Sequence, residues 1–180
     1  RLYRNGMHLV IESKKECTMF MNFEKLWDHY QDLFSNMKYI AQRTIQPALA
    51  DGKRFDFRVL AHWSEIEQKY SVTGVAIRAS EPYRLTTHLI NGGCILPYKR
   101  IQNANHDSFI KTLVEEIGAT LTKEIGFFGE FSIDAGLSND GNYVLYEVNS
   151  KPMSFDEEDI EQNRIIKLCE LFLQKLEFGD

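Results

Sequence analysis

The chain has 180 residues, of which 43% are apolar and 26% charged, and its formal net charge is −5. This balance favours a packed core over disorder, and an acidic chain gives no sign of a basic surface for nucleic acid. No apolar run approaches the ~20 residues that cross a bilayer, and the odd number of cysteines without metal-like spacing favours a reducing cytosol.

The first half of the chain predicts short strands, one helix and two longer strands. In chain order we expect three short strands within 1–20, a helix at 22–37, a strand at 38–45, a loop at 47–52, and strands at 55–63 and 70–79. Asn22 is a suitable N-cap for the helix, whose large apolar residues recur at helical spacing. Because the chain opens on Arg1 within strand-like sequence, we interpret it as a piece of a longer protein.

The second half predicts two amphipathic helices on either side of a hairpin. We expect a helix at 107–125 capped by Asp107 or Ser108, strands at 127–137 and 143–149, and a helix at 156–177. Glutamates at the start of the last helix favour its N-terminus electrostatically. The whole pattern indicates an α+β fold in which antiparallel hairpins dominate.

The hairpin has a specific predicted register. Asp140 and Gly141 are the strongest kind of two-residue hairpin signal, a type I′ turn with positive φ at both positions. With these two residues as the loop, the residue numbers of two facing positions add up to about 281. Asp134 then lies opposite Glu147, and Ser132 lies opposite Asn149.

The alternation of side chains puts both carboxylates of this hairpin on one face. Ile133, Ala135, Leu137, Val144, Tyr146 and Val148 are expected on the apolar face, and the acids on the other. Like charges directly opposite repel, and a hard divalent cation would compensate them. Two carboxylates and the Asn149 amide form an oxygen set suited to Mg²⁺. The alternative is a solvated polar face, which is common in antiparallel sheets.

The same residues resemble a known family. The triplet Asp134, Glu147 and Asn149 is similar to the metal-binding set of ATP-grasp enzymes. Further stretches resemble that family in the same order: YIAQRTI (39–45), KRFDFRVL (53–60), THLINGGCILP (87–97), GEFSIDAGL (129–137) and YEVNSKPM (146–153). The nearest branch is the endospore-coat-associated YheC/YheD type. The resemblance covers the chain from residue 39 onward, and the first 38 residues more loosely.

The resemblance implies ATP and Mg²⁺ as cofactors, with Mn²⁺ as a substitute. The metal ligands would be Asp134, Glu147 and Asn149, and the catalytic residues Arg58 and Arg78. The nucleotide would contact Gln42, Arg43, Thr44, Ile45, Asp56, Arg58, Arg78, Gly92 and Gly93. Arginine forks suit phosphate oxygens, although a salt bridge is the alternative for either arginine alone. The Gly92-Gly93 pair has a tight turn as its alternative.

The resemblance also implies an organisation and a reaction. Residues 1–45 would be part of the central ATP-grasp subdomain, and residues 46–180 the C-terminal subdomain. The family's reaction is ATP-dependent ligation, in which a carboxylate substrate forms an acyl phosphate and an amine displaces phosphate. The identities of the carboxylate and amine are open; no nucleic acid or membrane partner is expected. The alternative is a non-catalytic structural or interaction protein of the spore coat, so the expected location is the cytoplasm or the coat.

Two departures from the family pattern bear on that choice. Ser132 stands where peptide ligases of the family often carry an arginine that holds the acyl phosphate. The family's glycine-rich phosphate loop and its lysine are expected upstream of this sequence. We therefore expect the 180 residues alone to fold, to bind Mg-ATP weakly and to have no ligase activity.

Overall fold

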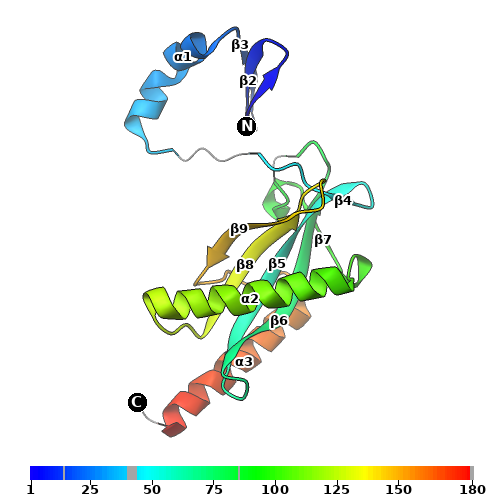
Figure 1. Cartoon of the computed structure of the whole chain (residues 1–180), viewed down its shortest axis with the longest axis vertical. Coiled ribbons are helices and arrows are strands. Elements are labelled where there is room, and N and C mark those ends of the chain that lie inside the picture. The colour runs from blue at the N-terminus through cyan, green and yellow to red at the C-terminus, as the bar shows by residue number, and fades with distance from the viewer. Residues whose placement is uncertain (14, 40–43, 85, 179–180) are drawn as a thin grey trace. The chain divides into compact units, whose positions relative to one another are not determined.

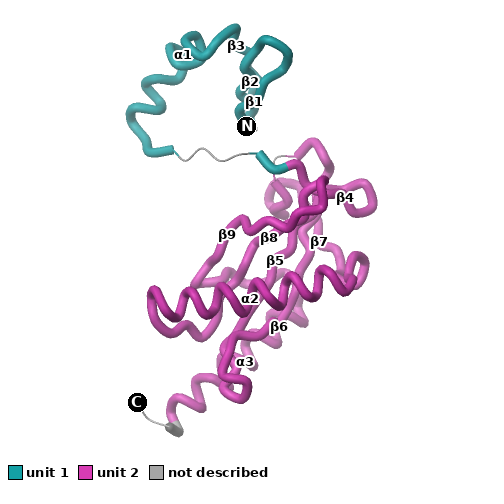
Figure 2. The backbone as a smooth tube through the Cα atoms, in the orientation of Figure 1, with its two compact units in different colours: residues 1–45 teal, residues 46–180 magenta. Residues whose placement is uncertain are grey.

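The computed structural model describes residues 1–13, 15–39, 44–84 and 86–178, and it divides into two compact units (Figures 1 and 2). The first unit is residues 1–45 and the second is residues 46–180. Their assignment to ATP-grasp subdomains stays a prediction. Within the described ranges, no helix has the length and apolar character needed to cross a membrane.

The first unit is a small antiparallel sheet followed by a helix. Strands β1 (Leu2–Asn5), β2 (His8–Glu12) and β3 (Cys17–Phe20) pair in chain order. Helix α1 (Phe23–Asn36) begins after Asn22, whose side chain accepts a hydrogen bond from the backbone N–H of Lys25. The predicted cap is therefore confirmed, and among the helix's apolar residues Leu26 is the buried one.

The second unit is built on an antiparallel sheet with the order β7-β6-β5-β8-β9 (Figure 1). Its strands are β5 (Lys53–Ser64), β6 (Lys69–Ser80), β7 (Cys94–Leu96), β8 (Glu130–Leu137) and β9 (Tyr143–Asn149), and the short β4 (Leu49–Ala50) pairs with β5. Short 3₁₀ turns at Leu89–Asn91 and Tyr98–Arg100 flank β7. Strand β9 is thus an edge strand beside β8. The expected α+β class with antiparallel pairing is confirmed.

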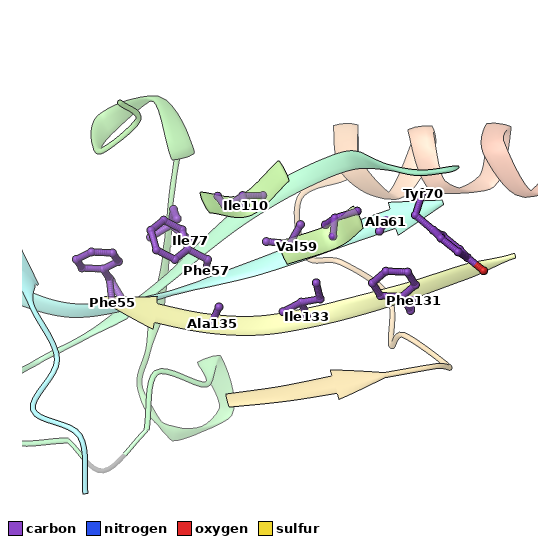
Figure 3. Close-up of a cluster of buried hydrophobic side chains, with 12 residues drawn as sticks. Phe55, Phe57, Val59, Ala61, Tyr70, Ile77, Ile110, Phe131, Ile133 and Ala135 are labelled. Carbon is purple, nitrogen blue, oxygen red and sulfur yellow. The ribbon is translucent and has the colours of Figure 1, made fainter. Parts of the chain in front are cut away.

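Two helices cover opposite faces of this sheet. Helix α2 (Ala104–Ile125) packs Ile110 and Val114 into a core with Phe57, Val59 and Ile133 (Figure 3). Helix α3 (Glu158–Phe178) lies on the other face, as Figure 1 shows.

The α3 face has its own small core, made by Leu60, Ala76, Phe155 and Ile160. Alternation along the strands places Asp56, Arg58 and Asp134 on this same face, because their neighbours Phe57 and Ile133 point toward α2.

The structure corrects three local expectations. Helix α2 begins at Ala104, three residues before the expected start, because the Asn103 side chain caps it by accepting from the His106 N–H at 2.9 Å. The two-residue Asp-Gly turn with positive φ at both positions is at Asp51 (51°) and Gly52 (76°), where β4 turns into β5. Of the expected strand at 38–45, residues 40–43 lie outside the described ranges and the others are not assigned to a strand.

Candidate functional site

The hairpin of β8 and β9 places the two predicted acids side by side. Asp134 is the cross-strand partner of Glu147, and Ser132 is the partner of Asn149. Nearer the turn, however, Leu137 faces Tyr143 and Ala135 faces Leu145, so those pairs are offset by one residue from the predicted register. An irregularity between Asp134 and Ala135 restores the predicted pairing at the acids.

The turn itself explains the offset. Ser138 and Asn142 close a three-residue loop through the Ser138 N–H to the Asn142 carbonyl (2.8 Å), and the Asn142 N–H donates to the Ser138 hydroxyl (3.0 Å). Gly141 has a φ of 83°, whereas Asp140 is not among the described residues with positive φ. The predicted type I′ turn at Asp140-Gly141 is therefore wrong, and a three-residue loop ending in a left-handed glycine replaces it.

The irregularity also moves two tyrosines. Tyr143, which strict alternation would place on the same face as Glu147, packs against the α2 core, where its ring stacks on Phe109 at 4.0 Å between centroids. Tyr146, expected in the core, lies on the acid face: a Cβ on Gly136 would come within 2.3 Å of its hydroxyl. Val148 keeps its predicted place beside the core, so Glu147 and Asn149 face the other way.

Arg78 joins Asp134 to Asp56. Its Nε donates to Asp56 Oδ1 at 2.8 Å, and its Nη2 lies 2.8 Å from Asp134 Oδ2. All three residues are less than a tenth exposed. Thr87, also buried, donates its hydroxyl to the other oxygen of Asp56. The guanidinium therefore lies between two carboxylates on neighbouring strands rather than in open solvent.

Burial and charge oppose each other in this cluster. Burial raises the pKa of Asp56 above its ordinary value, although the Arg78 charge and the hydrogen bonds from Arg78 and Thr87 act in the opposite direction. Burial disfavours the Arg78 cation, but the Asp56 and Asp134 carboxylates outweigh it and raise the pKa of Arg78. Arg78 is therefore charged at any physiological pH.

Arg58, the second predicted catalytic residue, lies next to this cluster. It is the cross-strand partner of Asp134 on β5. Its Nη2 donates to the Met153 carbonyl at 2.9 Å, and its guanidinium lies 4.6 Å from the centre of the Phe155 ring. These contacts tie Arg58 to the segment that follows β9.

The other predicted nucleotide residues are distributed unevenly. Gly92 has a φ of 84°, and a Cβ on Gly93 would lie 2.0 Å from the Thr87 carbonyl oxygen, so both glycines are required by a tight turn. That turn adjoins the Asp56 cluster through Thr87. Thr44 and Ile45 are described but are not in a strand, and Gln42 and Arg43 lie outside the described residues.

The donor set fits a hard divalent cation. Asp134 and Glu147 are opposite each other, Asn149 is on the same face, and all three offer oxygen. Arg78 uses Oδ2 of Asp134, and Oδ1 of the same carboxylate is a second potential ligand. Among the described residues, no group of three or more His, Cys, Asp and Glu side chains is arranged for a metal ion. A cation here would therefore depend on the amide, water and phosphate as well.

A comparison with family models decides the classification. The model for YheC/D-like ATP-grasp proteins matches residues 3–178. The chain belongs to the YheC/D-like ATP-grasp family. Membership in this family carries an expectation of ATP-dependent ligase-type chemistry, and the ATP-grasp resemblance read from the sequence motifs is confirmed.

A curated relative supports the same branch. The chain is 30% identical over 123 residues to the endospore coat-associated protein YheD of Bacillus subtilis (strain 168), a match that covers 63% of this chain. It covers 26% of the relative, so the chain spans about a quarter of that protein's length.

Several residues at this face were not found by sequence reasoning. Thr87 and Tyr146 approach the acids, and Glu130 and Arg164 form an ion pair farther along β8 on the same face (2.7 and 2.8 Å). An isolated threonine or an acid at the start of a strand is no signal by itself. The position of Tyr146 depends on the irregularity in the hairpin, which strict alternation cannot reveal.

Proposed function

We propose that residues 46–180 are the Mg-ATP-binding C-terminal subdomain of an ATP-dependent carboxylate–amine ligase that acts through an acyl phosphate. Residues 1–45 would be part of the central subdomain, and residues 42–45 would offer backbone groups to adenine. The observation that carries the proposal is the pairing of Asp134 with Glu147 on the face opposite α2, beside Arg58. Family membership supports the nucleotide and the ligase-type chemistry.

The charge of this face suits a metal–phosphate complex. Asp56, Asp134 and Glu147 supply three negative charges, against two positive charges from Arg58 and Arg78, which leaves about −1 for a divalent cation to reverse. With the cation present, the cluster would carry about +1 and attract the polyphosphate.

Each residue of the cluster has a definite task in this proposal. Asp134, Glu147 and Asn149 would hold Mg²⁺, which when bound neutralises phosphate charge and aligns the transferred phosphoryl group. Arg78 would orient Asp134 from the buried side through its Nη2 contact with Oδ2. Arg58 would offer to phosphate oxygens the N–H groups that do not hold the Met153 carbonyl. Positioning and charge, rather than a protein nucleophile, would supply the rate.

The proposal is tested by binding Mn²⁺ and ATP to the chain. Free Mn²⁺ is measured by electron paramagnetic resonance without nucleotide, for the parent and for Glu147→Gln, and ATP binding is measured separately by calorimetry. Loss of a ligand charge is expected to weaken Mn²⁺ binding at least ~10-fold, or about 1.4 kcal/mol. The matched control is Glu124→Gln, because Glu124 is exposed at the end of α2. Equal Mn²⁺ binding by the parent and Glu147→Gln would refute the metal site.

One observation favours a second function, a structural role without catalysis. Ser132, the cross-strand partner of Asn149, is 2% exposed and stands where peptide ligases of the family often carry an arginine. The named relative is described as endospore coat-associated. If the parent binds neither Mn²⁺ nor ATP, the structural role becomes the better explanation.

A further inference from the structure

We propose that Arg164 is a positioning residue for the metal set, acting through the segment that follows Asn149. This inference rests on the proposed function. The pairing of β9 with β8 ends at Asn149, and among the described residues no strand pairs with the backbone beyond it. Side chains from α3 and β5 form hydrogen bonds with this part of the backbone instead.

Arg164 makes contacts in three directions. It donates to both oxygens of Glu130 (2.8 and 2.7 Å), to Glu161 (3.3 Å) and to the Pro152 carbonyl (3.1 Å). Its side chain is 15% exposed and that of Glu130 14%. A bidentate pair of this kind fixes the guanidinium plane. The second N–H of Nη2 therefore has a fixed direction. It points at the Pro152 carbonyl, three residues after Asn149.

The segment after β9 is held at successive positions. Arg164 holds the Pro152 carbonyl, Arg58 holds the Met153 carbonyl at 2.9 Å, and Glu161 accepts from the Phe155 N–H at 2.9 Å. If the ion pair served only to dock α3 on the sheet, these backbone contacts would be unnecessary. Their pattern ties Asn149 and Arg58, one metal ligand and one phosphate candidate, to the same support.

The Arg164–Glu130 pair that supports this segment also contacts a buried residue of the sheet. Glu130 is the cross-strand partner of His62, whose Nε2 lies 3.3 Å from the carboxylate and whose Nδ1 lies 2.8 Å from the Thr73 hydroxyl. His62 is 2% exposed. Since Glu130 and Asp134 share strand β8 and one face, the support fixes Asn149 relative to the strand that carries Asp134. Contacts that orient metal ligands typically change metal affinity 10–100-fold.

The test measures Mn²⁺ binding to the 180-residue chain by electron paramagnetic resonance, without nucleotide. Arg164→Gln removes the charge, and Arg164→Lys keeps it but cannot form the two-nitrogen fork on Glu130 that fixes the direction of the Nη2 donor toward Pro152. Both variants are expected to weaken Mn²⁺ binding about 10-fold. Lys167→Gln is the matched control, because Lys167 pairs with Glu170 at the exposed side of the same helix. Circular dichroism checks folding, and Arg164→Lys serves if Arg164→Gln does not fold.

A double-mutant cycle separates positioning from general support. In an Asn149→Ala background, Arg164→Lys should change Mn²⁺ affinity less than about 2-fold, because its route through Asn149 is gone. An equal loss in both backgrounds overturns the positioning role. If the folded Arg164 variants bind Mn²⁺ like the parent while Glu147→Gln binds it more weakly, the role of Arg164 is refuted and the metal site is not. If the parent fails to bind Mn²⁺, or Glu147→Gln binds equally, the proposed metal site and this inference both fail.

Discussion

Replacing Arg78 by methionine removes the cation between two buried carboxylates. Asp56 and Asp134, 7% and 8% exposed, would then face each other without Arg78. Breaking a buried pair by removing one partner typically costs about 3–5 kcal/mol of unfolding free energy. For a unit of this size, that corresponds to a fall of roughly 10–15 °C in the unfolding temperature.

The pH dependence of this loss has a definite sign. Burial already raises the pKa of Asp56, and without Arg78 it rises further. A carboxyl whose folded pKa lies above its unfolded value binds more protons when folded, so stability falls as pH rises through that window. Arg78→Met should therefore be destabilised more at pH 8 than at pH 5. Adding Asp56→Asn should recover part of the loss at pH 8.

Urea unfolding followed by circular dichroism at pH 5 and pH 8 measures both effects. Arg100→Met is the matched control, because Arg100 pairs with Asp51 at 3.6 Å on the surface, and a change below about 1 kcal/mol is expected there. A loss under about 1 kcal/mol for Arg78→Met, or an equal loss at both pH values, would contradict the buried-cluster argument.

Three further outcomes are expected. Arg58→Ala should weaken Mg-ATP binding by at least about 1.5 kcal/mol in calorimetry, because charge-assisted bonds to phosphate are lost; parent-like binding would leave only its contacts to the segment after β9. Gly74→Ala should lower the free energy of unfolding by about 1–3 kcal/mol, since its Cβ would lie 2.6 Å from Ile160. An unchanged urea midpoint would show that α3 can shift away from the sheet without loss of stability. Burial raises the pKa of Glu130, but hydrogen bonds and charge from Arg164 and His62 outweigh it and lower that pKa to about 2. The contribution of Glu130 to stability is therefore present above pH 4.5 and is lost as pH falls toward 2. Glu130→Gln should show a shallower acid loss than the parent in the same unfolding assay.

The β8–β9 hairpin shows which parts of the site local sequence patterns can predict. Alternation and the Asp-Gly signal predicted that Asp134 faces Glu147, and that pairing is present. The turn was wrong and the pairs near it are offset, because Ser138 closes a different loop. The irregularity beside Asp134 compensates for the offset. A correct pairing therefore followed from two local errors that cancel, which no single-strand pattern could reveal.

By itself, the sequence determined what depends on neighbours along the chain: the strands with alternating residues, the helix that starts after Asn22, and the acid face of the hairpin. It also carried the order of motifs that indicated the family. Only the tertiary structure decided that Arg78 lies between Asp56 and Asp134, because the strand order β6-β5-β8 brings together residues far apart in the sequence. The support by Arg164 likewise depends on α3 packing across the sheet, a choice made by the fit of whole surfaces rather than by local propensity.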